Sequence, residues 1–253
     1  MDRRLFLQSF GAGVASLSLP AVASQPLSCK IIGIGAAGCN LAVALRANNI
    51  LDRADAALSY VCIDLGPHAL EFVDIANDAN PALTPIKTLM LAPLRAGGRV
   101  NAARAACLHH RAVLTDMLTG SDMVVLLAGL GGGTGSGVTP IMVRAARDAG
   151  ALTVAAVVTP FDYEGVRNRR ADAAINRLQR EADLVMAFSN EEWINRYRDD
   201  TPLFDVFDAL DRHIADRLSS VISRLNTPKS QFSEPTRSTV NRRCPLGPQA
   251  APS

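Results

Sequence analysis

Aromatic residues are scarce in this chain of 253 residues, at 5% of the total. Proteins that bind single-stranded nucleic acid without sequence preference stack bases on aromatic side chains, so this scarcity argues against that function. An excess of charge of one sign is also lacking, because 26 Lys and Arg against 24 Asp and Glu leave a net charge of +2. A charge so close to zero gives no reason to expect a nucleic-acid partner or an acidic membrane surface.

Motifs for metals, disulfides and membrane spans are also lacking. The five cysteines form no CxxC pair and their count is odd, which argues against a disulfide framework and a zinc site. The four histidines have no metal-ligand spacing, so no metal-binding residue is predicted. No catalytic residue is predicted. No segment approaches ~20 uninterrupted apolar residues, so no transmembrane segment is expected.

Composition changes along the chain divide it into three parts. Residues 1–28 read as a leader, with Arg3 and Arg4 before an apolar run and an A-x-A pattern at 21–23 that resembles a twin-arginine export signal. Residues 29–226 contain enough apolar sequence to form a folded domain. Residues 227–253 are rich in Pro, Ser and Thr and are predicted to be a disordered tail.

The middle part predicts an α/β domain, in which apolar strand segments alternate with helical segments. The predicted strands are 30–35, 59–64, 87–91, 122–128, 152–159 and 184–188, and the predicted helices are 38–48, 101–118, 139–149, 165–181 and 203–225. This alternation is typical of a Rossmann-like, mostly parallel sheet with helices on both faces. Ligands of such sheets bind at the carboxyl ends of the strands.

The richest glycine segment is GLGGGTGSG at 129–137, between a predicted strand and a predicted helix. Glycine permits positive φ angles and lets a phosphate approach the backbone N–H groups closely, and Thr134 and Ser136 add hydroxyl donors. The segment therefore predicts a phosphate-binding loop.

A second glycine loop leaves two nucleotide interpretations open. GIGAAG at 33–38 follows the first strand, and Asp64 ends the second strand, as in dinucleotide-binding folds. An NAD(P)-binding oxidoreductase is therefore one alternative. However, two phosphate-binding loops at one crevice suit a triphosphate better. A P-loop is excluded because the chain contains no GxxxxGK[ST] motif.

These motifs, together with PFDYEG at 160–165 and the long apolar-periodic segment 203–225, resemble the tubulin/FtsZ GTPase family. The resemblance covers about residues 30–225 and implies the family's nucleotide-binding domain without its C-terminal domain. It implies GTP or GDP as ligand, with Mg²⁺ as an ion that can accompany it. The nucleotide-binding residues implied by the resemblance are Gly35, Ala36, Ala37, Asn40, Asp64, Gly131, Gly132, Gly133, Thr134, Gly135, Glu164, Arg167, Asn190, Phe207 and Asp211.

Several of these residues take individual roles from the resemblance. Asn40 matches a guanine contact and Phe207 a residue that stacks near the base. Glu164 is expected to contact the ribose, and Arg167 or Arg169 to approach the phosphates. Asp211 is the nearest counterpart of an Asp that pairs with guanine, although it lies one residue before the expected position, which Arg212 occupies.

Two departures from the family pattern bear on activity. AGGR at 96–99 is an altered form of the loop that senses the γ-phosphate. The segment after residue 225 lacks the paired acids that the family inserts into the site of a neighbouring subunit. We therefore expect a GTP-binding protein, linked to filament assembly or cell division, whose hydrolysis is impaired or depends on a partner subunit.

The partners expected from this interpretation are a guanine nucleotide, further copies of the chain, or a full-length filament of the family. Cytoplasmic localisation is favoured because GTP is a cytosolic ligand, and twin-arginine export is the alternative. Besides the oxidoreductase, the sequence leaves open a degenerate family remnant that binds nothing.

Overall fold

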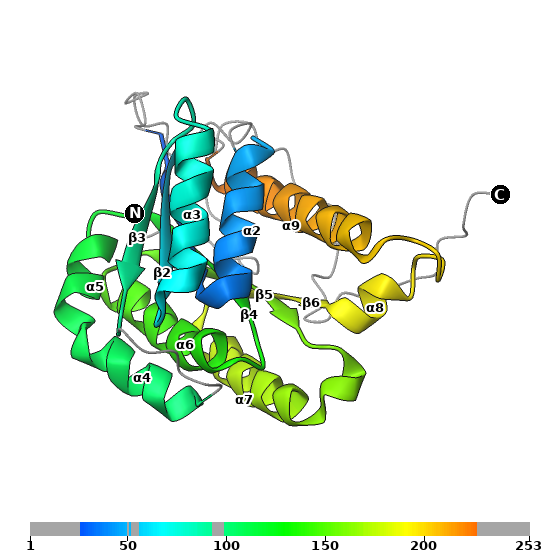
Figure 1. Cartoon of the computed structure of the whole chain (residues 1–253). Coiled ribbons are helices and arrows are strands. Elements are labelled where there is room, and N and C mark those ends of the chain that lie inside the picture. The colour runs from blue at the N-terminus through cyan, green and yellow to red at the C-terminus, as the bar shows by residue number, and fades with distance from the viewer. Residues whose placement is uncertain (1–25, 50, 52–55, 93–98, 227–253) are drawn as a thin grey trace, which may run out of the picture.

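The computed structural model describes residues 26–49, 51, 56–92 and 99–226 (Figure 1). Nearly all of the predicted leader and all of the predicted tail lie outside these residues, as do residues 96–98 of the altered AGGR loop. The described residues therefore cover nearly all of the predicted domain 29–226.

The described chain forms a six-stranded sheet in the order β3-β2-β1-β4-β5-β6. Every adjacent pair of these strands is parallel, so the predicted α/β class is confirmed and the sheet is parallel throughout. The strands are β1 (Ser28–Ile34), β2 (Ala57–Asp64), β3 (Ile86–Met90), β4 (Met123–Gly129), β5 (Leu152–Thr159) and β6 (Leu184–Ser189).

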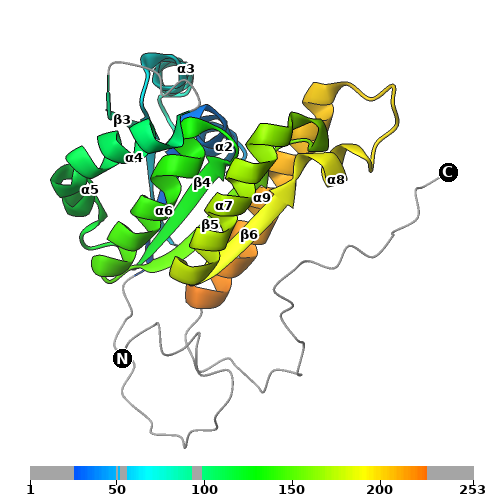
Figure 2. The same cartoon turned by 90° about the horizontal axis from the view of Figure 1, so that it is seen from below.

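Helices cover both faces of the sheet (Figures 1 and 2). One face carries α2 (Gly35–Ala47), α3 (Pro67–Ala79) and α9 (Leu203–Asn226). The other carries α4 (Val100–His109), α5 (Arg111–Leu118), α6 (Gly133–Asp148) and α7 (Gly165–Glu181). A short helix, α8 (Asn190–Ile194), follows β6.

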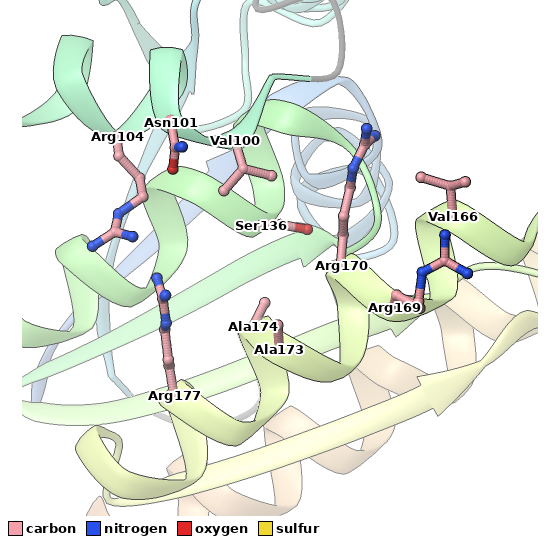
Figure 3. A pocket seen from close by; sticks show the side chains of 10 residues that line it. All are labelled: Val100, Asn101, Arg104, Ser136, Val166, Arg169, Arg170, Ala173, Ala174 and Arg177. Atoms are coloured by element: carbon pink, nitrogen blue, oxygen red, sulfur yellow. The ribbon is translucent and has the colours of Figure 1, made fainter.

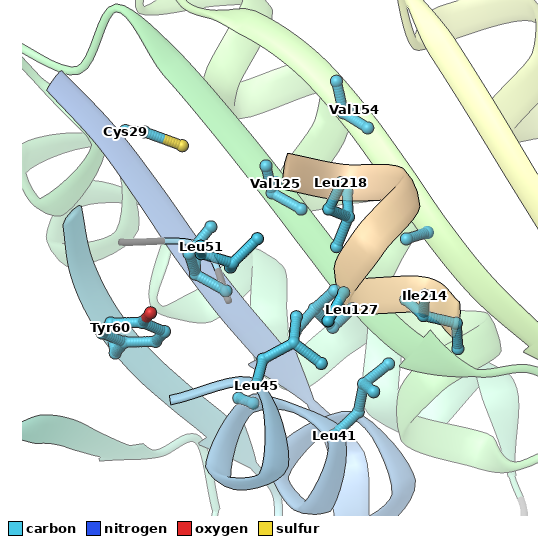
Figure 4. Close-up of a cluster of buried hydrophobic side chains, with 14 of the residues drawn as sticks. Cys29, Leu41, Leu45, Leu51, Tyr60, Val125, Leu127, Val154, Ile214 and Leu218 are labelled. Carbon is cyan, nitrogen blue, oxygen red and sulfur yellow. The ribbon is translucent and has the colours of Figure 1, made fainter. Parts of the chain in front are cut away.

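Successive side chains along each strand point to opposite faces of the sheet, which divides the core into two layers. Ile31 and Val125 point to the side of α2 and α9, where they are fully buried. Their neighbours Ile32 and Leu126 point to the opposite layer. Figure 4 shows the first layer, where α9 lies over β4 and β5. Because both faces are covered, nearly every residue of the central strands is apolar.

The helices differ from the prediction in five places. Helix α2 begins at Gly35 and not at residue 38. Helix α3 is not predicted by the sequence, because only Ala69, Leu70 and Val73 of its residues are buried and its apolar pattern is weak. The predicted helix 101–118 is two helices, α4 and α5, which meet at His110. Helix α6 begins at Gly133 and not at residue 139, because packing against the sheet overrides the low helix propensity of its glycines. Helix α8 is also absent from the prediction, since it is too short to show a period.

In the described part of the chain, no helix combines the length and the hydropathy needed to cross a bilayer.

Close packing of α2 on β4 depends on Gly38. A Cβ added at Gly38 would lie 2.3 Å from the carbonyl oxygen of Leu127, which belongs to the backbone of β4. We predict that Gly38→Ala lowers the free energy of unfolding by about 1–3 kcal/mol, because α2 must move away from the sheet. Chemical denaturation measures this change. Gly165→Ala is the control, since no heavy atom lies within 4 Å of its added Cβ, and equal denaturation midpoints for the two variants would contradict the prediction.

Candidate nucleotide site

Two helix starts at the carboxyl edge of the sheet, those of α2 and α6, have no side-chain cap. Helix α2 begins directly after β1, and α6 begins a few residues after β4. Neither N-cap residue, Ile34 or Gly132, supplies a side-chain hydrogen bond, and neither first turn contains an acid. Uncapped N–H groups and the positive end of the helix dipole attract anions. The starts of α3, α4, α5 and α7 lack a side-chain cap as well, whereas the N-cap of α8, Ser189, accepts a hydrogen bond from the N–H of Glu192.

The two loops that lead into these helices contact each other. A Cβ added at Gly35, where φ is +71°, would lie 3.3 Å from Cβ of Thr134. A Cβ added at Gly129 would lie 2.6 Å from Cβ of Ala37. The predicted phosphate loops are therefore one continuous surface. Gly132 faces open space on it, because nothing lies within 4 Å of its added Cβ.

Asp64 joins the end of β2 to this surface. Its Oδ1 accepts a hydrogen bond from the hydroxyl of Thr134 at 2.9 Å and another from the N–H of Leu65 at 2.7 Å. Three of the residues predicted from sequence, Gly35, Asp64 and Thr134, are thus brought together from three separate segments of the chain.

The hydroxyl groups of the glycine loop have a different role from the expected one. Ser136 Oγ accepts a hydrogen bond from the N–H of Gly131 at 2.8 Å, and the Thr134 hydroxyl donates to Asp64. The sequence predicts both groups as donors to a phosphate. In the structure they fix the shape of the loop, and Gly131 takes a φ of +92° within it. The donors that the loop offers are backbone N–H groups.

The segment between β5 and α7 closes one side of the site. A Cβ added at Gly131 would lie 2.9 Å from Cβ of Arg167, so the first turn of α7 packs on the glycine loop. Glu164 accepts a hydrogen bond from the N–H of Phe161 at 3.1 Å and forms an ion pair with Arg167. Both carboxylate oxygens of Glu164 therefore already have protein partners.

An aromatic cluster flanks this segment, although aromatic residues are rare in the chain. Phe161 stacks on Tyr163 with ring centroids 5.5 Å apart, and it lies 6.4 Å from the ring of Phe207 on α9. Sequence reasoning named Phe207 but missed the other two rings. It also missed Asn168, whose amide donates to the carbonyl oxygens of Phe161 and Asp162 and so fixes the turn. The PFDYEG motif was the only signal that could have indicated them.

Asp211 lies on the same face of α9 as Phe207, because residues i and i+4 are neighbours on a helix. Burial raises the pKa of its carboxyl to about 6, and the nearby Asp208 contributes to this rise. Arg212, in contrast, is exposed and forms an ion pair with Asp208. Of Asp211 and Arg212, it is therefore Asp211 whose side chain lies on the same face of α9 as Phe207.

The remaining predicted residues lie at the same edge of the sheet, around the phosphate loops. Ala36, Ala37 and Asn40 are exposed on the first turns of α2. Asn190 begins α8 at the end of β6. Its neighbour Glu191 accepts a hydrogen bond from the N–H of Asp162 at 3.3 Å, which connects α8 to the PFDYEG segment.

A parallel α/β sheet with two glycine loops meeting at its carboxyl edge defines a nucleotide-binding class of protein. The profile described as "Tubulin/FtsZ family, GTPase domain" matches residues 28–198. The chain belongs to the tubulin/FtsZ family, a family of proteins that bind GTP and GDP. This finding overturns the oxidoreductase alternative.

Curated relatives and solved structures agree with the family. The chain is 29% identical over 213 residues to the cell division protein FtsZ of Neisseria gonorrhoeae, covering 81% of this chain and 50% of that protein. It is 28% identical over 239 residues to the same protein of Pseudomonas aeruginosa, covering 90% and 58%. It thus spans about half the length of the curated relatives it matches.

Among solved structures, an empty FtsZ dimer of M. jannaschii is similar with a TM-score of 0.65 and 25% identity, covering 81% of this chain and 57% of that one. The GTPγS-bound protofilament of CetZ2 from Haloferax volcanii is similar in fold, with a TM-score of 0.64 at 22% identity. This likeness covers 78% of this chain and 58% of that one.

The raised pKa of Asp211 makes a prediction about stability. Because the folded pKa of about 6 exceeds the ordinary value of 3.8, ionised Asp211 destabilises the fold. The free energy of unfolding should fall as the pH rises from about 4 to about 7, and Asp211→Asn should remove that fall. At pH 7 the variant should be more stable than the natural chain by about 1–2 kcal/mol, since partial exposure screens the carboxylate.

Urea denaturation across this pH range measures the effect. Asp205→Asn is the control, because Asp205 is exposed on the first turn of the same helix. A pH profile of Asp211→Asn that parallels the natural one would rule out this role for the carboxyl.

Proposed function

We propose that this chain binds a guanine nucleotide at the carboxyl edge of its sheet, with the phosphates on the starts of α2 and α6. The observation that carries the proposal is the contact between two uncapped helix starts at Gly35 and Thr134. Each start offers N–H groups and a positive dipole end, and together they can hold more phosphate than either could alone. Added side chains at Gly35 or Gly129 would fill the space between the loops.

The base and ribose would lie between α2 and the aromatic cluster. Phe207 is exposed beside Phe161 and would stack on the base, and Asn40 is exposed on α2. Ionised Asp211 offers two acceptor oxygens, which match the N1–H and 2-amino donors of guanine. Glu164 and Asn190 would border the ribose, and the charge of Arg167, which lies beside the glycine loop, would favour the phosphates.

Mg²⁺ would accompany the phosphates, since it prefers oxygen ligands and is commonly held partly by phosphate. Among the described residues, no group of His, Cys, Asp and Glu is arranged to hold a metal by itself. The nucleotide would therefore have to supply part of the coordination.

Hydrolysis would depend on acids from another subunit. Attack of water on the γ-phosphate needs a group that orients and polarises that water. Residues 227–233, which follow α9, contain neither Asp nor Glu. The proposed activity is therefore nucleotide binding with impaired hydrolysis, in a protein that works beside another family member in filament assembly or cell division.

The proposed location is the cytoplasm, because GTP is available there. The twin-arginine pattern of residues 3–7 supports export as the competing location. Cell fractionation of a tagged chain, with the mature N-terminus determined, separates the two. Cleavage after Ala23 and recovery outside the cytoplasm would overturn the proposal of location.

Base specificity gives a direct prediction for Asp211. We expect Asp211→Asn to weaken GTP binding by about 10- to 100-fold, because the amide cannot accept from both guanine donors. XTP carries a carbonyl in place of the 2-amino group, so the Asn amide can donate to it, and the variant should prefer XTP over GTP. Fluorescence competition with both nucleotides measures the reversal.

Asp205→Asn should keep the natural preference for GTP, since Asp205 is exposed at the beginning of α9. If Asp211→Asn loses GTP affinity without gaining XTP affinity, Asp211 does not take part in base recognition. If well-folded natural chain binds no guanine nucleotide at millimolar concentration, the site itself fails and the degenerate-remnant alternative stands.

Turnover provides a separate prediction. The chain alone should retain bound GTP with phosphate release near the uncatalysed rate. Addition of a full-length FtsZ should start release if that protein contributes acids to the bound nucleotide. Phosphate release during single turnover measures both. Rapid turnover by the chain alone would contradict the requirement for a partner.

A further inference from the structure

A pocket rich in arginine lies between α4 and α7, on the face of the sheet opposite to α9 (Figure 3). It has a volume of about 280 Å³. Its polar lining residues are Asn101, Arg104, Ser136, Arg169, Arg170 and Arg177. Four of these six are cations, and no Asp or Glu lines the pocket.

The spacing of residues on α7 explains why the arginines gather. Arg170, Ala174 and Arg177 recur at intervals of three and four and therefore share one helix face. The small side chains of Ala173 and Ala174 leave room between the arginines. Arg104 projects from α4 on the other side, and Figure 3 shows its guanidinium group and that of Arg177 pointing toward each other.

These guanidinium groups have no counterion in the described part of the chain. Arg104, Arg169, Arg170 and Arg177 form no ion pair or hydrogen bond with any described side chain or carbonyl. Neighbouring arginines do: Arg111 lies 3.8 Å from the carboxylate of Asp148, and Arg147 donates to the carbonyl oxygen of Glu181 at 2.7 Å.

Like charges in a partly enclosed site repel one another, and a bound anion offsets that cost. Arg104, Arg170 and Arg177 are only partly exposed, so water screens them less than it screens free surface charges. Guanidinium groups also match phosphate geometry, because each can donate two parallel N–H bonds to one phosphate. We infer that this pocket binds a compact anion that carries two or more phosphate groups.

The pocket begins beside the proposed guanine nucleotide site and extends away from it, and Arg104 and Arg177 line its far end (Figure 3). Helix α7 starts beside the glycine loop and runs back to the amino end of β6, so Arg177 lies about 16 Å along the helix from Val166. Val100, Ser136 and Val166 lie beside both regions, and the Ser136 hydroxyl is engaged with Gly131. The volume suits a small molecule, and the scarcity of aromatic rings gives a nucleic-acid strand no stacking surface there.

Inorganic pyrophosphate is the probe for this inference. Titration calorimetry should detect its binding to the natural chain, and saturating GTP should not displace it. The double variant Arg104→Gln, Arg177→Gln should lose at least tenfold in pyrophosphate affinity while its GTP affinity stays unchanged. The control Arg144→Gln, Arg180→Gln removes the same charge from exposed positions of α6 and α7 that do not line the pocket.

If both double variants lose pyrophosphate affinity equally, the loss follows from net charge alone, and the inference is overturned. Displacement of pyrophosphate by GTP would assign the binding to the nucleotide site, and citrate binding as tightly as pyrophosphate would overturn the preference for phosphate. Ala173→Glu gives an independent check, because it places a carboxylate between the arginines and should abolish pyrophosphate binding. GTP binding by each variant confirms that it is folded. If the natural chain does not bind GTP, the proposed function is contradicted, but the inference about this pocket is not.

Discussion

Close approach of backbone to backbone at three glycines is the constraint on which the carboxyl edge of this sheet depends. A Cβ at Gly33 would lie 2.6 Å from the carbonyl oxygen of Gly38, and one at Gly38 would lie 2.3 Å from that of Leu127. At Gly135 the nearest atom is the carbonyl oxygen of Gly129, at 2.1 Å. Any larger residue would force α2 and α6 away from the strands. The glycines therefore place two helix starts against one another and against the sheet.

That packing has an electrostatic consequence. Two helix N-termini bring their partial positive charges to one place, and no side chain caps either of them. Asp64, the nearest acid in this arrangement, is held by the Thr134 hydroxyl and the N–H of Leu65. The surface is stable without a ligand because its polar side chains are satisfied internally, while its backbone donors stay available for an anion.

At Asp211, stability opposes the proposed role in base recognition. A partly buried carboxylate with a second carboxylate nearby has a pKa of about 6, so its ionised form costs folding free energy at neutral pH. Such costs are common where a side chain is kept for binding. A similar cost is expected on the other face of the sheet, where arginines with no partner among the described residues line one pocket. Both places are among the proposed ligand sites.

The sequence by itself determined the parallel α/β class, the six strands and the two glycine loops, because buried parallel strands are continuous apolar runs and tight anion-binding turns require glycine. Only the tertiary structure decided which groups those loops use: the Thr134 and Ser136 hydroxyls bind protein partners. It also revealed α3, the break at His110, and the placement of Arg104 opposite Arg177 across a pocket. These features depend on how helices far apart in sequence pack on one sheet, and local periodicity carries no information about such contacts.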